Sequence, residues 1–263
     1  MTWEILLFGG IAGLIIATVT TPVGVSGAVF LLPVQLSLLG VPSPAVTPTN
    51  LMFNVVAGPG ALLRYRHDGG LAGPLTRLLL IGTLPGVVLG ALIRVFAVPG
   101  PRIFRLIVAA VLLPLGLWLC VRAVRPARRI RAAPFSPRTV VALAVAAGTV
   151  GGIYGIGGGS LLGPVLAGRG TPIAQVAPAV LASTFVTSIA GAATYALLSR
   201  TTPGDIAPEW ALGLCCGLGG LVGGYLGARL QPRLPETGLR LLLGGLATAL
   251  AVVYLLQAGN VLG

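Results

Sequence analysis

The residues best suited to hold a small anion gather around two glycine-rich breaks in otherwise apolar sequence. The first break reads Gly24-Val25-Ser26-Gly27, and the second reads Gly155-Ile156-Gly157-Gly158-Gly159-Ser160. Each runs over the same spacing to a proline, Pro33 or Pro164, and each follows an apolar stretch long enough to cross a bilayer. Paired interruptions in corresponding positions of two halves are typical of the binding site of a secondary transporter.

A glycine-rich break can bind an anion through the backbone alone. It presents N–H groups at the start of the helix that follows, where the helix dipole adds partial positive charge. Ser26 and Ser160 are placed to cap such helix starts or to donate to an oxyanion. Two helix starts that meet near the middle of the membrane would form an anion site without a buried cation.

The next apolar segment in each half carries polar side chains that we expect to face the break. Asn50 and Asn54 are four residues apart, as are Ser183 and Thr187, so each pair lies on one helix face. The competing interpretation is that the glycines pack helices and the hydroxyls bond back to their own helix. The predicted substrate-binding residues are Gly24, Ser26, Gly27, Asn50, Asn54, Gly155, Gly157, Gly158, Gly159, Ser160, Ser183, Thr184 and Thr187.

Other chemistries lack the side chains that they require. The acidic residues all lie in loops or near the ends of apolar segments, and His67 is the single histidine. With no metal-ligand cluster and no intramembrane base to activate a nucleophile, we predict no enzyme, no metal and no cofactor. The adjacent Cys215 and Cys216 fit neither a redox nor a metal pattern and are expected to pack.

Composition places the chain in a membrane. It is 56% hydrophobic and 8% charged, whereas soluble domains carry about 25% charged residues. Its 17 basic residues are all arginines in short loops, a pattern typical of membrane orientation rather than of nucleic-acid binding. We predict a multi-pass protein of the cell (inner) membrane, with the bilayer and a small anion as partners and no nucleic acid. The first segment lacks the basic start of a cleavable signal and is expected to be retained.

Ten apolar segments follow one another, with one basic linker in the middle. The expected domains are a first membrane repeat over 1–124, a cytoplasmic Arg/Pro linker over 125–137 and a second membrane repeat over 138–263. Besides the breaks, Leu89-Gly90-Ala91 matches Leu226-Gly227-Ala228, which indicates an internal duplication. Glycines at four-residue spacing are expected to pack helices closely rather than to bind substrate; they are Gly82, Gly86, Gly90, Gly219, Gly223 and Gly227.

Arginine placement predicts the orientation of the two repeats. Cytoplasmic loops are enriched in arginine, and the linker region 122–138 holds six. If all ten segments cross, thirteen arginines are cytoplasmic and four are outside; if 26–40 and 160–168 are re-entrant, the split is ten to seven. We therefore favour five crossings per half, which makes the repeats inverted. The expected fold is an all-α polytopic membrane protein with two inverted repeats and Gly-rich broken helices.

These motifs resemble those of the TauE/SafE family of sulfite exporters. The similarity rests on Gly151–Pro164, on Ala182-Ser183-Thr184 and, in the first half, on Gly40–Val46, Thr49-Asn50-Leu51 and Arg64-Tyr65-Arg66. It covers nearly the whole chain. The first break departs from the family's usual triple glycine, because Ser26 and Ala28 stand where glycine is commoner. The resemblance implies a bacterial-type plasma-membrane permease for sulfite, sulfoacetate or related anions.

The predicted function is a secondary transporter for a small sulfur-containing or organic oxyanion that works by alternating access. The sequence leaves the anion, the direction and the coupling ion open. A passive anion channel is one alternative. A membrane redox scaffold that uses Cys215 and Cys216, or a structural subunit that needs a partner, is the other.

Overall fold

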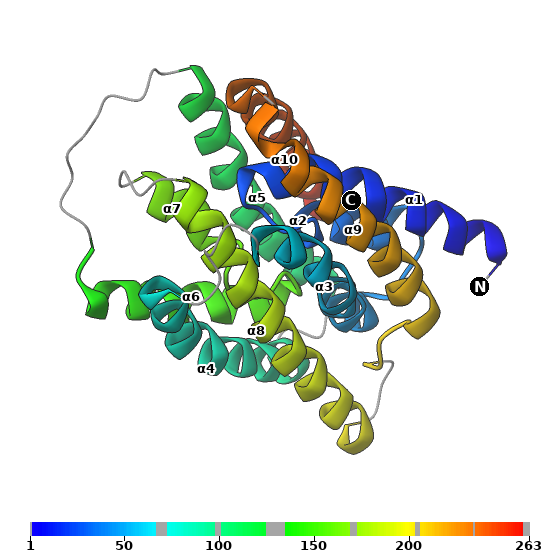
Figure 1. Cartoon of the computed structure of the whole chain (residues 1–263). Coiled ribbons are helices and arrows are strands. Elements are labelled where there is room, and N and C mark those ends of the chain that lie inside the picture. Colours follow the sequence, from blue (N-terminus) through cyan, green and yellow to red (C-terminus); the bar gives the residue numbers. More distant parts are fainter. Residues whose placement is uncertain are drawn as a thin grey trace.

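The chain folds into a bundle of α-helices (Figure 1). The computed structural model describes residues 2–66, 73–97, 101–124, 135–168, 173–202, 206–233 and 235–259. Within these ranges there are helices and no strand, so the all-α prediction is confirmed. The helices are α1 (Trp3–Thr20), α2 (Ala28–Ser37), α3 (Ser43–Arg66), α4 (Pro74–Phe96), α5 (Pro101–Val124), α6 (Pro137–Tyr154), α7 (Leu162–Gly168), α8 (Ile173–Thr201), α9 (Trp210–Leu230) and α10 (Glu236–Gly259), with 3₁₀ turns η1 (Thr21–Val23) and η2 (Gln231–Arg233).

Five of the described helices are long and apolar enough to cross a membrane: α1, α4, α6, α8 and α9. Large apolar side chains such as Leu7, Ile15, Leu197 and Leu218 project from them with roughly half or more of their surface exposed. A soluble protein would not leave so many large side chains uncovered. The prediction of a multi-pass membrane protein is confirmed.

The helices that follow the two breaks are short. α2 has 10 residues and α7 has 7, so at about 1.5 Å per residue each covers half or less of a core of roughly 30 Å. Each runs back along the next long helix. Ser26 and Ala28 lie beside Asn54 and Asn50, and the second break likewise approaches α8 in reverse order, so α2 and α7 are antiparallel to α3 and α8.

Two glycine seams hold the bundle together, and each joins one helix from either half. The Cβ that a side chain would add at Gly219, Gly223 or Gly227 would lie 1.9–2.6 Å from the carbonyl oxygens of Gly10, Leu14 and Thr18 on α1. The Cβ atoms of Gly82, Gly86 and Gly90 would lie 2.1–2.5 Å from those of Val141, Val145 and Thr149 on α6. The backbones touch, as small residues at four-residue spacing permit, so the expected packing role is confirmed.

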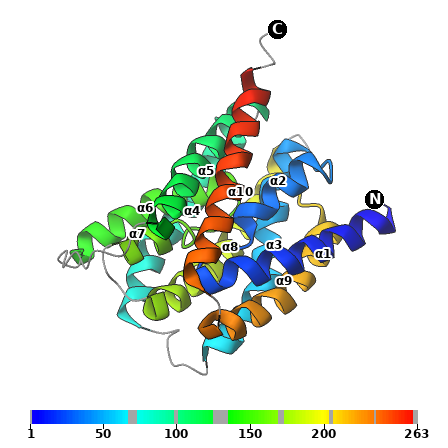
Figure 2. The same ribbon diagram turned by 90° about the horizontal axis from the view of Figure 1, so that it is seen from above.

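The order of contacts gives the direction of each helix. α1 and α9 run parallel, as do α4 and α6, because contacting residues advance together along both seams (Figures 1 and 2). α9 also runs parallel to α3, because Gly213 packs against Met52 and Gly217 packs against Val56. α3 and α8 are antiparallel, since Gly58 meets Phe185 while Gly191 meets Leu51.

The remaining long helices complete this pattern. α4 runs parallel to α8, because Thr83 bonds Ser183 and Val87 packs on Gly191. α5 and α10 lie side by side and antiparallel, with Gly116 against Thr248 and Gly244 against Cys120 (Figure 2). α1 is consequently antiparallel to α6, α3 to α8, α4 to α9 and α5 to α10.

The predicted linker, 125–137, lies mostly outside the described residues, which resume at Phe135. Ser136 caps α6, since its hydroxyl oxygen accepts a hydrogen bond from the Thr139 N–H at 3.2 Å. Pro137 is the first residue of α6, a position that suits proline because its missing N–H would have no partner there.

Candidate functional site

All thirteen predicted substrate-binding residues are buried. They gather at the two breaks and on the faces of α3 and α8 that cover them. Asn54 lies halfway along the 24-residue α3, and Thr187 lies halfway along the 29-residue α8. Each break thus approaches the middle of a long helix.

The first break turns through Gly24. This residue has a φ of +72° and its N–H bonds the Thr21 carbonyl at 2.9 Å. A left-handed φ favours glycine, which has no Cβ to clash with its own backbone. The turn directs the chain from η1 across to the start of α2, and Ala177 of α8 packs against it.

Ser26 and the two asparagines of α3 join the first break to its neighbour. The Ser26 hydroxyl donates to Asn54 Oδ1 at 2.5 Å and accepts from the Ala28 N–H at 3.2 Å. Asn50 Nδ2 donates to the Ala28 carbonyl at 2.8 Å. The expectation that Ser26 serves the start of the next helix matches this geometry, and Asn50 holds the same helix in place.

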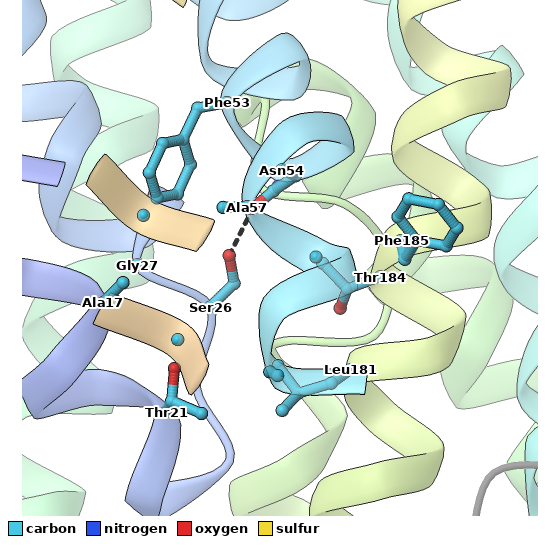
Figure 3. Close-up of a pocket in the computed structure, with 14 residues that line it drawn as sticks. Ala17, Thr21, Ser26, Gly27, Phe53, Asn54, Ala57, Leu181, Thr184 and Phe185 are labelled. Carbon is cyan, nitrogen blue, oxygen red and sulfur yellow. Dashed lines mark hydrogen bonds between the residues drawn. The ribbon is translucent and has the colours of Figure 1, made fainter. Parts of the chain in front are cut away.

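A small cavity opens at this break (Figure 3). Its volume is about 30 Å³, room for about two water molecules. Four predicted residues line it: Ser26, Gly27, Asn54 and Thr184. Phe53 and Phe185 stand on either side. The wall is completed by small residues of α3 and α9, among them Ala57 and Gly224, and by Ala17, Thr21 and Leu181.

Polar atoms remain unused in this buried region. Among the described residues, Asn54 Nδ2 has no hydrogen-bond partner, although Asn54 is only 4% exposed and lines the cavity. Asn50 Oδ1 and the hydroxyl of Thr20 also lack one there. A buried donor without a partner costs about 1–3 kcal/mol, so the Asn54 amide is a group that a ligand in the cavity would satisfy.

The second break contains two glycines with left-handed φ, Gly155 at +81° and Gly157 at +72°. It is tied to α8 through its own backbone, because the Gly158 N–H donates to the Thr187 hydroxyl at 3.1 Å. Ser160 Oγ lies 3.2 Å from Thr184 Oγ1 and donates to the Ile156 carbonyl at 3.2 Å. Ser160 therefore bonds backward into the break rather than capping the helix that follows; its other predicted role, donation to an oxyanion, stays a prediction.

Dense packing surrounds the second break. A Cβ at Gly158 would lie 2.5 Å from Thr83 Cβ, and one at Gly159 would lie 2.2 Å from the Val180 carbonyl oxygen. Thr83 of α4 and Ser183 of α8 bond each other across this region, with 3.0 Å between their hydroxyl oxygens. Ser188 Oγ, beside Gly157, is buried without a partner among the described residues.

Several cavity-lining residues were not predicted from sequence. Phe53 and Phe185 are aromatic residues in apolar segments, and nothing in their spacing separates them from lipid-facing ones. Gly220 and Gly224 directly follow the seam glycines Gly219 and Gly223, and this doubled glycine is the one signal that α9 has a second close-packed face. Thr83 lies next to Gly82, which itself packs against α6.

No group of three His, Cys, Asp or Glu side chains capable of holding a metal occurs among the described residues. Cys216 is buried in the α1–α9 seam, where its carbonyl oxygen would lie 2.1 Å from a Cβ at Gly13.

The chain is similar to one known family over nearly its whole length. The family model described as sulfite exporter TauE/SafE matches residues 9–254, a span that contains both breaks, the cavity and both seams. No curated protein and no solved structure gives a significant match. The family is one of transporters, so a membrane setting and a small anionic substrate follow from membership. The chain belongs to the sulfite exporter TauE/SafE family.

Proposed function

We propose that this chain is a secondary transporter for a small oxyanion, with sulfite first among the candidates, in the cell (inner) membrane. The observation that carries the proposal is the buried Asn54 amide, which lines a cavity and has no bonding partner for its nitrogen among the described residues. An N–H donor in a dry, apolar setting binds an anion more strongly than it would in water. The first break supplies Ser26 and backbone N–H groups beside it.

Inverted repeats are the proposed architecture. In the four pairs of long helices that correspond between the halves, the members are antiparallel, as expected when one repeat is turned over in the membrane. Both short helices run back from the middle of a long helix toward its start. With the orientation that the arginine placement predicts, α3 ends on the cytoplasmic face with Arg64 and Arg66, and α4 ends on the outer face.

Alternating access is the proposed mechanism. The cavity extends from Asn54 along the second half of α3 to Ala61, toward the cytoplasmic face. The second break is packed more tightly, because a Cβ at Gly158 would lie 2.5 Å from Thr83 Cβ, whereas one at Gly27 would lie 3.1 Å from the Phe53 ring. Two inverted repeats that adopt opposite states would leave an open space at one break and a filled space at the other.

The cavity is too small for sulfite as it stands. A volume of about 30 Å³ accommodates about two waters, whereas sulfite has one sulfur and three oxygens. Binding therefore requires α2 and α8 to separate near Ser26 and Thr184. The state described corresponds to a constricted form that faces the cytoplasm.

The test compares Asn54→Asp with unaltered protein. The aspartate still accepts from Ser26, but it replaces the free N–H donor by a carboxylate oxygen that repels an anion. Sulfite at about a hundredfold over its dissociation constant adds roughly 2.7 kcal/mol to the unaltered protein. We expect thermal unfolding in detergent to show none of this stabilisation in Asn54→Asp.

Thr18→Val is the matched control, because its hydroxyl bonds only the Leu14 carbonyl among the contacts described for it. It should keep the sulfite response. Sulfate, thiosulfate, sulfoacetate, taurine and simple carboxylates at equal ionic strength establish the preferred anion. Equal stabilisation of Asn54→Asp and unaltered protein would remove Asn54 from the site.

The alternatives predict different flux in proteoliposomes. A carrier saturates as the anion concentration rises, whereas a passive channel does not. A redox scaffold would fail when Cys215 and Cys216 are both replaced by alanine, and the proposed transporter would retain its flux. A structural subunit would move no anion until its partner is added.

A further inference from the structure

Two equivalent positions lie at the ends of α4 and α9. The matching stretches Leu89-Gly90-Ala91 and Leu226-Gly227-Ala228 set the alignment of the halves, and three residues beyond each comes Arg94 or Gln231. α4 and α9 point in opposite directions, as their packing on the antiparallel α8 and α3 shows. The two side chains therefore lie at opposite ends of the bundle.

Gln231 bridges two elements at the end where α3 finishes. Its Oε1 accepts from the Tyr65 hydroxyl at 2.7 Å, and its Nε2 donates to the Pro22 carbonyl at 3.0 Å. Tyr65 packs in a cluster with Ala61 and Leu181, both of which line the cavity. This bridge joins α3 to η1 immediately before the first break and spans the cytoplasmic end of the cavity.

Arg94 lies at the other end and connects the end of α4 to the start of α3. It is 2% exposed, and its Nη2 donates to the carbonyl and hydroxyl oxygens of Ser43, the first residue of α3, at 2.5 and 2.8 Å. The hydroxyl of Tyr195 on α8 donates to the Gly152 carbonyl at 2.9 Å. Gly152 lies just before the second break, as Pro22 lies just before the first.

The packing around Arg94 matches that around Gln231. Tyr195 and Ala91 share a cluster with Leu51, and Leu51 fills the space beside Gly191. Gln231 therefore ties the approach to the first break to the end of α3, whereas Arg94 ties the end of α4 to the start of α3.

The two positions differ in charge. A buried guanidinium inside a membrane protein is costly and marks a functional site, and it recognises oxyanions through paired, charge-assisted hydrogen bonds. An arriving oxyanion competes directly with the uncharged Ser43 oxygens for the Nη2 hydrogens. Gln231 makes neutral hydrogen bonds that offer an anion no comparable gain.

We propose that Arg94 and Gln231 are gates at the two ends of one anion path. Arg94, at the outer gate, binds the arriving anion, and this binding releases the contacts of Arg94 with Ser43 and opens the gate. This inference rests on the proposed transport function. Gln231 is the cytoplasmic gate; its hydrogen bonds are neutral, and it opens without recognising charge. An anion thus meets its selective contact on the outer face, at a distance from the cavity at Asn54.

The test measures uptake of radiolabelled sulfite into right-side-out and inside-out membrane vesicles. Arg94→Gln gives both gates the same side chain. We expect it to raise the KM for sulfite offered at the outer face by about tenfold or more, because hydrogen bonds to charged groups contribute about 1.5–3 kcal/mol. The KM at the cytoplasmic face should change little. Arg94→Lys keeps the charge without the planar pair of donors and should recover part of the loss.

Arg200→Gln is the matched control, since it removes the same charge from an exposed position at the end of α8, on the same face. It should leave both KM values unchanged. Gln231→Ala should leave the outer KM unchanged and should increase labelling of an Ala61→Cys variant by a membrane-impermeant thiol reagent from the cytoplasmic side. The native cysteines are replaced for that measurement.

Two results would overturn the gates. One is an equal change of both KM values in Arg94→Gln with no recovery in Arg94→Lys, which a purely structural arginine would give. The other is unchanged Ala61→Cys labelling in Gln231→Ala. A complete lack of flux in unaltered protein, for sulfite and for every anion of the panel, would instead reject the proposed function. The labelling measurement would still test the cytoplasmic gate at Gln231.

Discussion

The two breaks carry equivalent residues in different surroundings. At the first break, Asn54 bonds a side chain, Ser26, and the space beside it is open. At the second break, Thr187 bonds the Gly158 backbone, and Thr83 fills the space that a Cβ would need. In the proposed repeats Asn54 and Thr187 occupy the same position, so the difference lies in how closely α3 and α8 pack on the breaks and in which side chain each provides.

This difference indicates a division of labour. The first break departs from the triple glycine and gains a hydroxyl, a cavity and an unused amide donor. The second keeps its glycines, and their lack of side chains lets α4, α6 and α8 close around the backbone. We infer that the second break packs tightly and is the point about which the helices move, and that the first break forms the more adaptable wall of the binding site.

The largest expected contrast is between Gly158→Ala and Gly27→Ala. The added Cβ at Gly158 would lie 2.5 Å from Thr83 Cβ and 3.0 Å from the backbone of Gly148, whereas at Gly27 its nearest neighbour is the Phe53 ring edge at 3.1 Å. Overpacking of this kind costs about 1–3 kcal/mol or more. Gly158→Ala should abolish sulfite flux, and Gly27→Ala should retain most of it.

Membrane insertion of both variants, measured by protease protection, should be normal. Gly245→Ala is a suitable control because nothing lies within 4 Å of its added Cβ. Equal flux in the Gly158 and Gly27 variants would mean that the two breaks do not differ in tightness.

A second contrast separates stability from transport. Thr187→Val leaves the buried Gly158 N–H without its acceptor, which should lower the free energy of unfolding by about 1–3 kcal/mol. Asn54→Leu removes an amide whose nitrogen has no partner among the described residues. It also takes the acceptor from the Ser26 hydroxyl, but Ser26 lines the cavity, where a water can replace it, so the variant should lose flux at a smaller cost in stability. Thermal unfolding and flux on the same preparations test this pair. The reverse assignment, with Asn54→Leu the less stable protein, would contradict it.

The smallest expected effect comes from Thr83→Val. This nearly isosteric change removes the hydrogen bond to Ser183 while it keeps the packing against Gly158. A hydrogen bond of this kind contributes about 1 kcal/mol, so flux should change by about fivefold or less. Loss of all flux would assign the Thr83 hydroxyl a direct part in binding.

Sequence predicted the all-helical membrane fold because apolar length is a property of single segments. The glycine seams were also predictable, since four-residue spacing places small residues on one face of a helix. The pairing of helices was not, because nothing in the sequence says that Gly219 meets Gly10 rather than another helix. The domain boundaries and the substrate-binding role of the thirteen residues stay predictions.

Within the candidate site, sequence predicted which residues gather and missed what they bond. The asparagine and hydroxyl faces of α3 and α8 meet the breaks because four-residue spacing fixes a helix face. Of the two roles predicted for Ser160, capping a helix is not seen, because its hydroxyl donates to Ile156 and α7 begins only at Leu162; donation to an oxyanion stays a prediction. Arg94 looked like one more loop arginine, because its burial depends on the start of α3 lying against the end of α4.

The glycine seams also constrain how the protein is made. α1 leaves the ribosome about 200 residues before its partner α9. Until α9 arrives, the bare glycine backbone of α1 contacts lipid, so neither half completes its own packing. Assembly must therefore end with late helices docking on early ones, as is usual for contacts between segments far apart in the chain. A chain truncated before α9 would lack the whole α1–α9 seam. The glycine face of α1 would then stay uncovered, and the cell's quality control would act on that exposed face instead of on a closed bundle.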